Sequence, residues 1–211
     1  MKKTSLLFAL PLLLTVACDN DPGKGKAKTG ASAPVAAPAV APAGAVKHSF
    51  SAADSKLEFV GAKVTGSHDG SFKEFSGSID LVGGDLTKSV VNVEIKMASL
   101  AIEPEKLAGH LKTGDFFDVE KFPTAKFVST TVKAGGEKGA SHTVTGNLTL
   151  HGVEKSISFP ATIKAEGDNV SVNAEFAINR KDFGIVYPGK PDDLIKDEVA
   201  IKLTLAAKKS G

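Results

Sequence analysis

Apolar and polar side chains alternate with a period of two along much of the chain from residue 46 onward. This is the period of a β-strand with one buried face. Glycine-rich turn signals, such as 82–85, 135–136 and 167–169, separate the alternating runs. The clear runs are 91–97, 170–178 and 199–205, and the noisier ones are 46–51, 57–64, 72–81, 124–133, 142–150 and 153–163. The pattern therefore predicts an all-β fold of eight or nine antiparallel strands.

Residues 104–117 depart from this pattern. Their apolar side chains recur near the helical spacing, Pro104 suits a first helical position, and Pro123 prevents continuation. The sequence therefore predicts one short helix at 104–117. Residues 190–193 follow Tyr187-Pro188-Gly189 and are interpreted as a loop before the last strand, with no chemistry assigned.

Short strands with one apolar face must either stack as a sandwich or close into a barrel, which removes exposed edges. Periodicity alone favours neither. The interior of an eight-stranded barrel is wide enough to be filled by side chains or to hold one small or elongated apolar ligand. Residues 46–208 have the size of one ordinary domain.

The first residues have the pattern of a lipoprotein signal peptide. Lys2 and Lys3 precede an apolar stretch at 6–16 that is too short to span a membrane. Residues 14–18, Leu-Thr-Val-Ala-Cys, resemble a lipobox, and Cys18 is the only cysteine in the chain. The alternative is a free or disulfide-bonded cysteine in a secreted protein, but the chain has no second cysteine with which Cys18 could form a disulfide. We therefore expect a signal peptide at 1–17 and lipidation of Cys18.

Residues 18–45 are predicted to be a disordered tether behind the lipidated cysteine. Lysine and glycine dominate its start, and alanine and proline dominate from residue 31, so it cannot build a core. Proline-rich chain extends by about 3.1 Å per residue, which would hold the domain several nanometres from the bilayer. We expect a protein of the cell envelope, on the periplasmic side, anchored through its lipid to the inner or the outer membrane.

Charge and motifs limit the function classes. The formal net charge is +2 with both signs interspersed, which favours neither nucleic acid nor a strongly acidic partner. The sequence contains no metal-binding histidine pair, nucleophile elbow, phosphate-binding loop or dinucleotide fingerprint. Five histidines are scattered without ligand spacing, although a fold could bring two or three together. We expect no enzyme, no catalytic residue, no metal and no cofactor other than a bound lipid.

Four segments, 58–77, 110–125, 146–155 and 179–185, carry a more specific signal. The most specific parts are the paired Phe116 and Phe117, the Gly-Asn-Leu-Thr-Leu-His-Gly stretch at 146–152 and Arg-Lys-Asp-Phe-Gly at 180–184. In this order, across the whole domain, they resemble the YceI-like family of lipocalin-fold, polyisoprenoid-binding periplasmic proteins. The resemblance implies an extended eight-stranded antiparallel barrel with an elongated apolar cavity.

The chain has twelve phenylalanines, one tyrosine and no tryptophan. A single phenylalanine more often fills an ordinary core, so a cavity lined by these rings follows from the family resemblance. The rings predicted to line the lipid tail are Phe59, Phe72, Phe116, Phe117, Phe127, Phe159, Phe176 and Phe183.

Four polar residues are candidates for contact with a ligand head group: Arg180, His151, Asp182 and His68. The guanidinium of Arg180 can hold a diphosphate or a carboxylate with two hydrogen bonds, and the alternative is an ion pair with Asp182 or another acid. His151 lies between Leu150 and a glycine, where it can instead bond to the backbone of a tight turn.

The favoured function is a membrane-tethered periplasmic protein that carries or sequesters an amphiphilic lipid with an isoprenoid-like or acyl tail. The alternative is a non-catalytic envelope or stress-response interaction module with a filled barrel, and an enzyme or metal binder ranks third. Relatives of this fold often pair, so a homodimer is compatible with the sequence, although no apolar stripe requires one.

Overall fold

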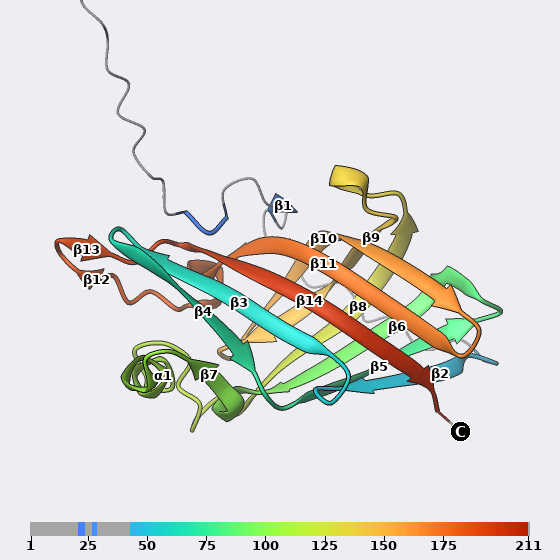
Figure 1. The fold of residues 1–211 in the computed structure, drawn as a ribbon, viewed down its shortest axis with the longest axis horizontal. Helices are drawn as coiled ribbons and strands as arrows, with labels where there is room; N and C mark the ends of the chain where they lie inside the picture. The colour runs from blue at the N-terminus through green and yellow to red at the C-terminus, as the bar shows by residue number, and fades with distance from the viewer. Residues whose placement is uncertain (1–20, 24–26, 29–42, 211) are drawn as a thin grey trace, which may run out of the picture.

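The computed structural model describes residues 21–23, 27–28 and 43–210, and its main body is a closed barrel (Figure 1). The predicted signal peptide, Cys18 and most of the predicted tether lie outside the described residues. The barrel strands are β2 (Val46–Ser51), β5 (Phe75–Val82), β6 (Asp85–Lys96), β8 (Thr124–Ala134), β9 (His142–Leu150), β10 (Val153–Glu166), β11 (Asn169–Asn179) and β14 (Glu198–Lys209). Each pairs antiparallel with the next in this order, and β14 closes the ring by pairing with β2. The predicted all-β fold and eight-stranded antiparallel barrel are confirmed.

The barrel wall is built differently at its two ends because β14 changes partner along its length. Near its end, Lys208 and Lys209 pair with β2, whereas residues 200–204 pair with β3 (Lys56–Lys63). β3 continues through β4 (Gly66–Phe72) to β7 (Leu100–Ile102). β4 was not predicted as a separate strand because residues 66–71 are polar or glycine and carry no apolar alternation.

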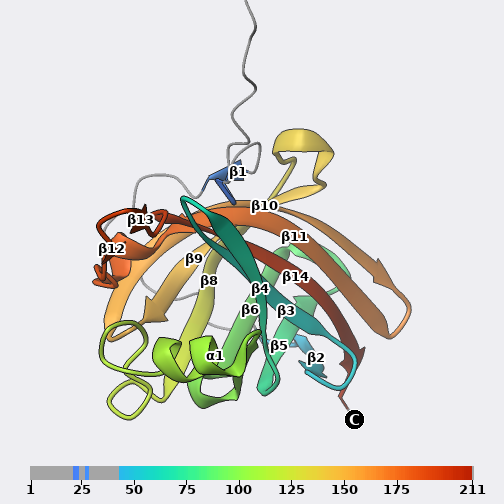
Figure 2. The ribbon, with the colours of Figure 1, turned by 60° about the vertical axis from the view of Figure 1, so that its left-hand side comes forward.

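The only α-helix among the described residues is α1 (Glu105–Leu111), which lies next to β7 at this end of the barrel (Figure 2). One short helix was predicted, but its predicted end at residue 117 is wrong. The last turn tightens where the Thr113 N–H donates to His110 O at 3.1 Å, and the chain then turns back, with the Phe117 N–H donating to Leu111 O at 3.0 Å. The rings of Phe116 and Phe117 reach the interior from this turn, which explains the apparent continuation of the helical spacing.

Side chains fill the interior at the β2 end of the barrel. Every second residue of the strands points inward there, as the alternation requires. The inward residues of this filled half, which are buried and do not line the cavity described below, include Phe50, Ile79, Val91, Val132, Val144, Ile163, Val170, Val172, Leu205 and Ala207.

Three strand glycines, Gly70, Gly77 and Gly146, make room for phenylalanine rings on neighbouring strands. Gly70 is paired with Phe59, and a Cβ at Gly70 would lie 2.2 Å from the Cζ of that ring. A Cβ at Gly146 would lie 2.4 Å from Phe127 Cζ and 2.6 Å from Val128 O. The second contact involves backbone, which cannot move aside without breaking the ladder between β8 and β9.

Gly146→Ala is therefore expected to destabilise the barrel by about 1–3 kcal/mol, because the added methyl group overpacks a strand. The matched control is Gly61→Ala in β3, where a Cβ would meet nothing within 4 Å. Replacing that glycine is expected to be neutral or to stabilise by up to about 1 kcal/mol. Urea unfolding midpoints of the two variants check this, and equal midpoints would contradict the packing described here.

Candidate ligand cavity

The barrel is hollow at the end where β3, β4 and α1 replace β2 in the wall. The cavity has a volume of about 490 Å³. Its apolar wall is formed by Leu57, Phe59, Phe72, Val93, Ile95, Phe127, Leu148, Ile157, Phe159, Phe176, Ile178, Ile201 and Leu203. The volume and the apolar lining are those of a pocket for one small molecule or one lipid tail.

The wall follows directly from the alternation in the sequence. Three strands each contribute two wall residues that are separated by one outward residue. These pairs are Val93 and Ile95 of β6, Ile157 and Phe159 of β10, and Phe176 and Ile178 of β11. Residues with this spacing lie on one face of a strand. The same pattern that fills the other half of the barrel therefore lines a space here.

The phenylalanine rings of the wall contact one another. Phe159 stacks on Phe176 with ring centroids 4.2 Å apart and planes 14° apart, and Phe127 tilts against Phe159 at 5.6 Å. On the opposite side, Phe72 lies 5.6 Å from Phe59 and 6.4 Å from Phe117. Such contacts fix the rings, so the wall is pre-formed.

Seven of the eight phenylalanines predicted to line the tail lie in the cavity wall: Phe59, Phe72, Phe116, Phe117, Phe127, Phe159 and Phe176. Phe183 does not. It belongs to the 3-10 turn η3 (Arg180–Phe183) and is 1% exposed in the packed core. Because Phe183 lies on a helical turn, strand alternation does not set the direction of its side chain. The pattern of the neighbouring residues therefore could not predict where the Phe183 ring points.

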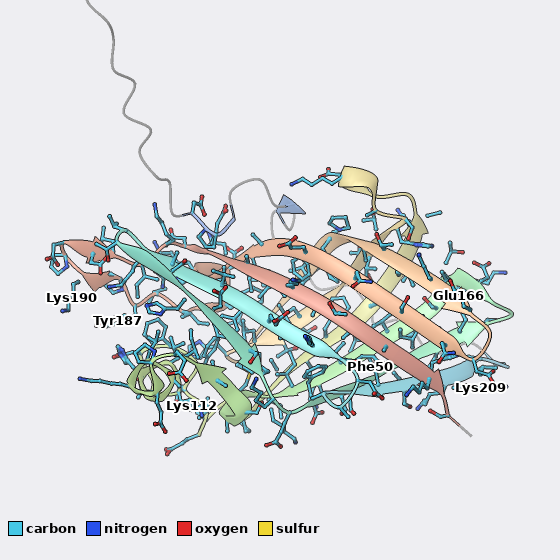
Figure 3. The ribbon with its side chains drawn as sticks, in the orientation of Figure 1. Phe50, Lys112, Glu166, Tyr187, Lys190 and Lys209 are labelled. Carbon is cyan, nitrogen blue, oxygen red and sulfur yellow. The ribbon has the colours of Figure 1, made fainter. Side chains whose placement is uncertain are left out.

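Residues of α1 and of a small hairpin, formed by β12 (Gly189–Lys190) and β13 (Asp193–Leu194), line one part of the cavity, and we infer that its mouth lies between them. The exposed residues of the lining, Pro104 and Lys190, lie at this mouth. Figure 3 shows the labelled Tyr187 and Lys190 at the left-hand end of the molecule, near α1. The hairpin corrects the interpretation of 190–193 as a plain loop.

A ring cluster joins the helix to the segment before this hairpin. The ring of His110 lies edge-on to Phe116 at 5.1 Å and to Tyr187 at 5.4 Å, and Phe116 and Tyr187 are 5.2 Å apart. His110 Nε2 is 2.9 Å from Asp115 Oδ2. Sequence reasoning assigned no site role to Tyr187 or His110, because only the fold brings residues 110 and 187 together.

The hairpin is fastened to the turn between β3 and β4. Asp193 accepts a hydrogen bond from the Lys63 ammonium group, and its other oxygen accepts from the Thr65 N–H at 3.1 Å. The bond from Lys63, together with those from Thr65, lowers the pKa of the Asp193 carboxyl below its ordinary value of 3.8. Backbone bonds from Val64 N–H to Leu194 O at 3.1 Å and from Lys196 N–H to Ala62 O at 2.8 Å complete the contact.

Arg180 is part of the cavity lining, but the protein itself uses its donors. The guanidinium donates to Ile185 O at 2.7 Å, to Lys196 O at 3.0 Å and to Ile195 O at 3.4 Å. It also pairs with Asp197 at 3.4 Å. Burial lowers the pKa of Arg180, and Asp197 opposes this effect. These bonds hold the segment that carries Tyr187 and the hairpin against the end of β11.

The structure does not bring the four predicted head-group residues together. His151 adopts a positive φ of 51°, its Nδ1 is 3.1 Å from Phe183 O, and it does not line the cavity. Asp182 is exposed and also lies outside the lining. His68 lines the cavity beside the mouth, where its Nδ1 is 3.0 Å from Glu103 O.

The described residues show neither a metal cluster nor a spanning helix. No group of three or more histidine, cysteine, aspartate or glutamate side chains gathers there in a way that could hold a metal ion. Within 21–23, 27–28 and 43–210, no helix has the length and hydropathy needed to cross a membrane.

A family model for the YceI-like domain matches residues 48–207. The chain belongs to the YceI-like domain family. A UPF0312 protein of Pseudomonas putida strain W619 is 39% identical over 139 residues, which cover 63% of this chain and 71% of the relative. A UPF0312 protein of Pseudomonas syringae pv. tomato is 43% identical over 126 residues, or 57% of this chain and 65% of the relative. The family predicted from the sequence is confirmed.

Solved structures of two other proteins share the fold of this chain. Burkholderia cenocepacia BcnA superposes with a TM-score of 0.63 at 24% identity, covering 74% of this chain and 98% of its own. A polyisoprenoid binding domain from Saccharophagus degradans superposes with a TM-score of 0.62 at 17% identity, covering 79% and 99%.

In this YceI-like barrel, Arg180→Met is expected to destabilise the fold by about 3 kcal/mol or more, because it removes the buried donor for three carbonyl groups. Thermal and urea unfolding measure the effect. The control is Lys181→Met, whose exposed pair with Asp197 at 2.9 Å is expected to contribute about 1 kcal/mol or less. Equal losses in the two variants would contradict a structural role for Arg180.

Asp193→Asn is expected to loosen the hairpin, raising exchange of the Val64 and Lys196 amides by about two- to fivefold, as for a partly exposed ion pair. Because the folded pKa is lowered, the wild-type bond is fully present above the ordinary value of 3.8 and is lost as the pH falls through the lowered pKa.

Hydrogen exchange, expressed as protection factors at several pH values, measures both effects. The wild type should lose protection at these amides only in acid, and Asp193→Asn should show no such transition. Asp192→Asn, at the exposed neighbouring position, is the control and should behave as the wild type does. Equal protection in all three proteins at neutral pH would refute the fastening.

Proposed function

We propose that this protein is a membrane-tethered periplasmic binding protein, and not an enzyme, which holds an amphiphilic lipid by its isoprenoid-like or acyl tail. The proposal rests on the cavity of about 490 Å³, whose wall is predominantly apolar. Each methylene group moved from water into such a space contributes about 0.8 kcal/mol. A tail of ordinary length therefore supplies enough free energy for stable binding after its ordering cost.

The head group of such a ligand belongs at the mouth. Inside the cavity, the one buried cation in the lining, Arg180, already donates to three carbonyl groups of the described chain. A charged head placed beside it would lose water and gain little in return, because most of the guanidinium donors already have partners, and this is costly. At the mouth, His68 and Lys190 are within the lining and remain in contact with solvent.

The polyisoprenoid binding domain of Saccharophagus degradans supports a prenyl tail as one ligand class. The lipobox-like sequence before Cys18 supports attachment to a membrane, where amphiphilic lipids reside. The alternative, an interaction module, required a barrel filled by side chains, and the hollow half of this barrel speaks against it.

The cavity is tested by filling it. Val93→Phe with Leu148→Phe places two rings into the space and is expected to raise the Kd for a fluorescent prenyl or acyl amphiphile by about tenfold or more. The control, Lys133→Phe with Lys164→Phe, adds two rings at exposed strand positions and should bind as the wild type does. Equal affinity of all three proteins would refute binding in the cavity.

Membrane attachment is tested at Cys18. Cys18→Ser is expected to abolish incorporation of radiolabelled fatty acid and to move nearly all of the protein from the membrane to the soluble fraction. Lipid binding by the barrel should be unchanged, because the cavity begins at Leu57 in the chain. A Cys18→Ser protein that stays in the membrane fraction would overturn the tethering part of the proposal.

A further inference from the structure

The hydrogen-bonded ladder between β10 and β11 covers only part of the length of these two strands. β10 and β11 pair from Glu166 and Asn169 up to Ala161 and Ala174. β11 then runs on to Asn179 with β14 along its other edge, whereas the first part of β10 pairs with β9. The two strands therefore separate toward the hollow half of the barrel.

Proline accounts for the point of separation. The next pair of the ladder would place Pro160 of β10 opposite Glu175 of β11. Proline has no backbone N–H to donate and is confined to strand edges and interruptions of a sheet. The edge of β11 beyond Ala174 is thus available for a different strand.

A segment from the N-terminal part of the chain lies on this edge. β1 (Ala27–Lys28) pairs parallel with β11, with Ala27 opposite Phe176 and Lys28 opposite Ala177 (Figures 1 and 2). Phe176 belongs to the cavity wall. The β1 backbone therefore supports the wall of the cavity from outside.

A second contact lies five residues away along the chain. Gly23 is buried, and a Cβ added to it would lie 1.9 Å from Oε2 and 3.1 Å from Cβ of Glu198. Glu198 begins β14 and pairs with Asn179, the last residue of β11. A side chain at residue 23 would have to displace the Glu198 carboxylate, and the contact lies where β11 leads into the segment that forms the cavity mouth.

We propose that β1 (Ala27–Lys28), together with the contact at Gly23, is a docking strand, which fastens the N-terminal segment of this chain to the β11 edge and holds the lipid anchor close to the cavity mouth. This rests on the proposed lipidation of Cys18. Four residues lie between Cys18 and Gly23, and the five steps of the chain from Cys18 to Gly23 span at most about 18 Å. A free tether from Cys18 to Val46 would reach about 90 Å in the proline-rich conformation. Docking therefore turns a long spacer into a short one, and the mouth faces the bilayer from which its ligand comes.

The docking itself is tested on the full-length chain with Cys18→Ser, which needs neither lipid nor ligand. Gly23→Val forces the Glu198 side chain away from residue 23, and Ala27→Pro removes a backbone N–H from β1. We expect amide exchange in residues 175–179 to rise about tenfold, with no change in the β3–β14 ladder. Ala36→Pro, the same kind of change outside the docking strand, is the control and should leave exchange unaltered.

Equal exchange in the variant and the wild type would overturn the docking strand. Protection that appears only as protein concentration rises would overturn it too, because the strand would then come from a second copy. These outcomes do not depend on lipidation, so they are distinguishable from a failure of the proposed function.

The position of the mouth is tested on the lipidated protein in vesicles. With Cys18 acylated, Lys190→Cys supplies a single free thiol at the mouth for a fluorescent donor. Energy transfer to an acceptor dye in the bilayer should be strong and should fall several-fold when Gly23→Val and Ala27→Pro are added. Equal transfer with and without these two changes would contradict the short tether.

Discussion

The structure depends on a ladder of main-chain hydrogen bonds that closes on itself through β14 and sends every second side chain of eight strands into one interior. At the β2 end, side chains such as Phe50 and Ile79 fill that interior. At the other end, β14 pairs with β3 instead, which brings β4, β7 and α1 into the wall. Because a barrel widens as its perimeter grows, side chains of the same kind leave a cavity of about 490 Å³ there.

The polar groups of this end stabilise the wall of the cavity more than they offer sites to a ligand. Arg180 holds the segment between β11 and β14 through three carbonyl groups, and Asp193 fastens the hairpin to Lys63 and Thr65. An apolar space with such a frame selects its ligand by length and shape, since each methylene contributes a similar free energy. Chemical discrimination is left to the mouth, where His68 and Lys190 are accessible.

The alternation in the sequence predicted most of the strands, and helical spacing predicted the single helix. The cavity-lining role of the phenylalanines came from the family resemblance, and seven of the eight predicted rings lie in the wall. Prediction failed at Phe183, which lies on a 3-10 turn, and beyond Leu111, where the apparent helix is a folded-back turn. β4 was not predicted because it is largely polar and shows no apolar alternation. The mouth was not predictable from sequence, because Lys63 and Asp193 lie 130 residues apart. Periodicity shows which face of a strand is buried, but not whether that face meets side chains or an empty space.

Native mass spectrometry with lipid extraction, on full-length protein released gently from the membranes of its native source, tests the central claim most directly. We expect one discrete added mass per chain, which resolves into an amphiphile with a prenyl or acyl tail and is absent from the variant with Val93→Phe and Leu148→Phe. Protein without an added mass, whose extract holds no more amphiphile than that of the filled variant, would contradict a lipid-binding function for this cavity.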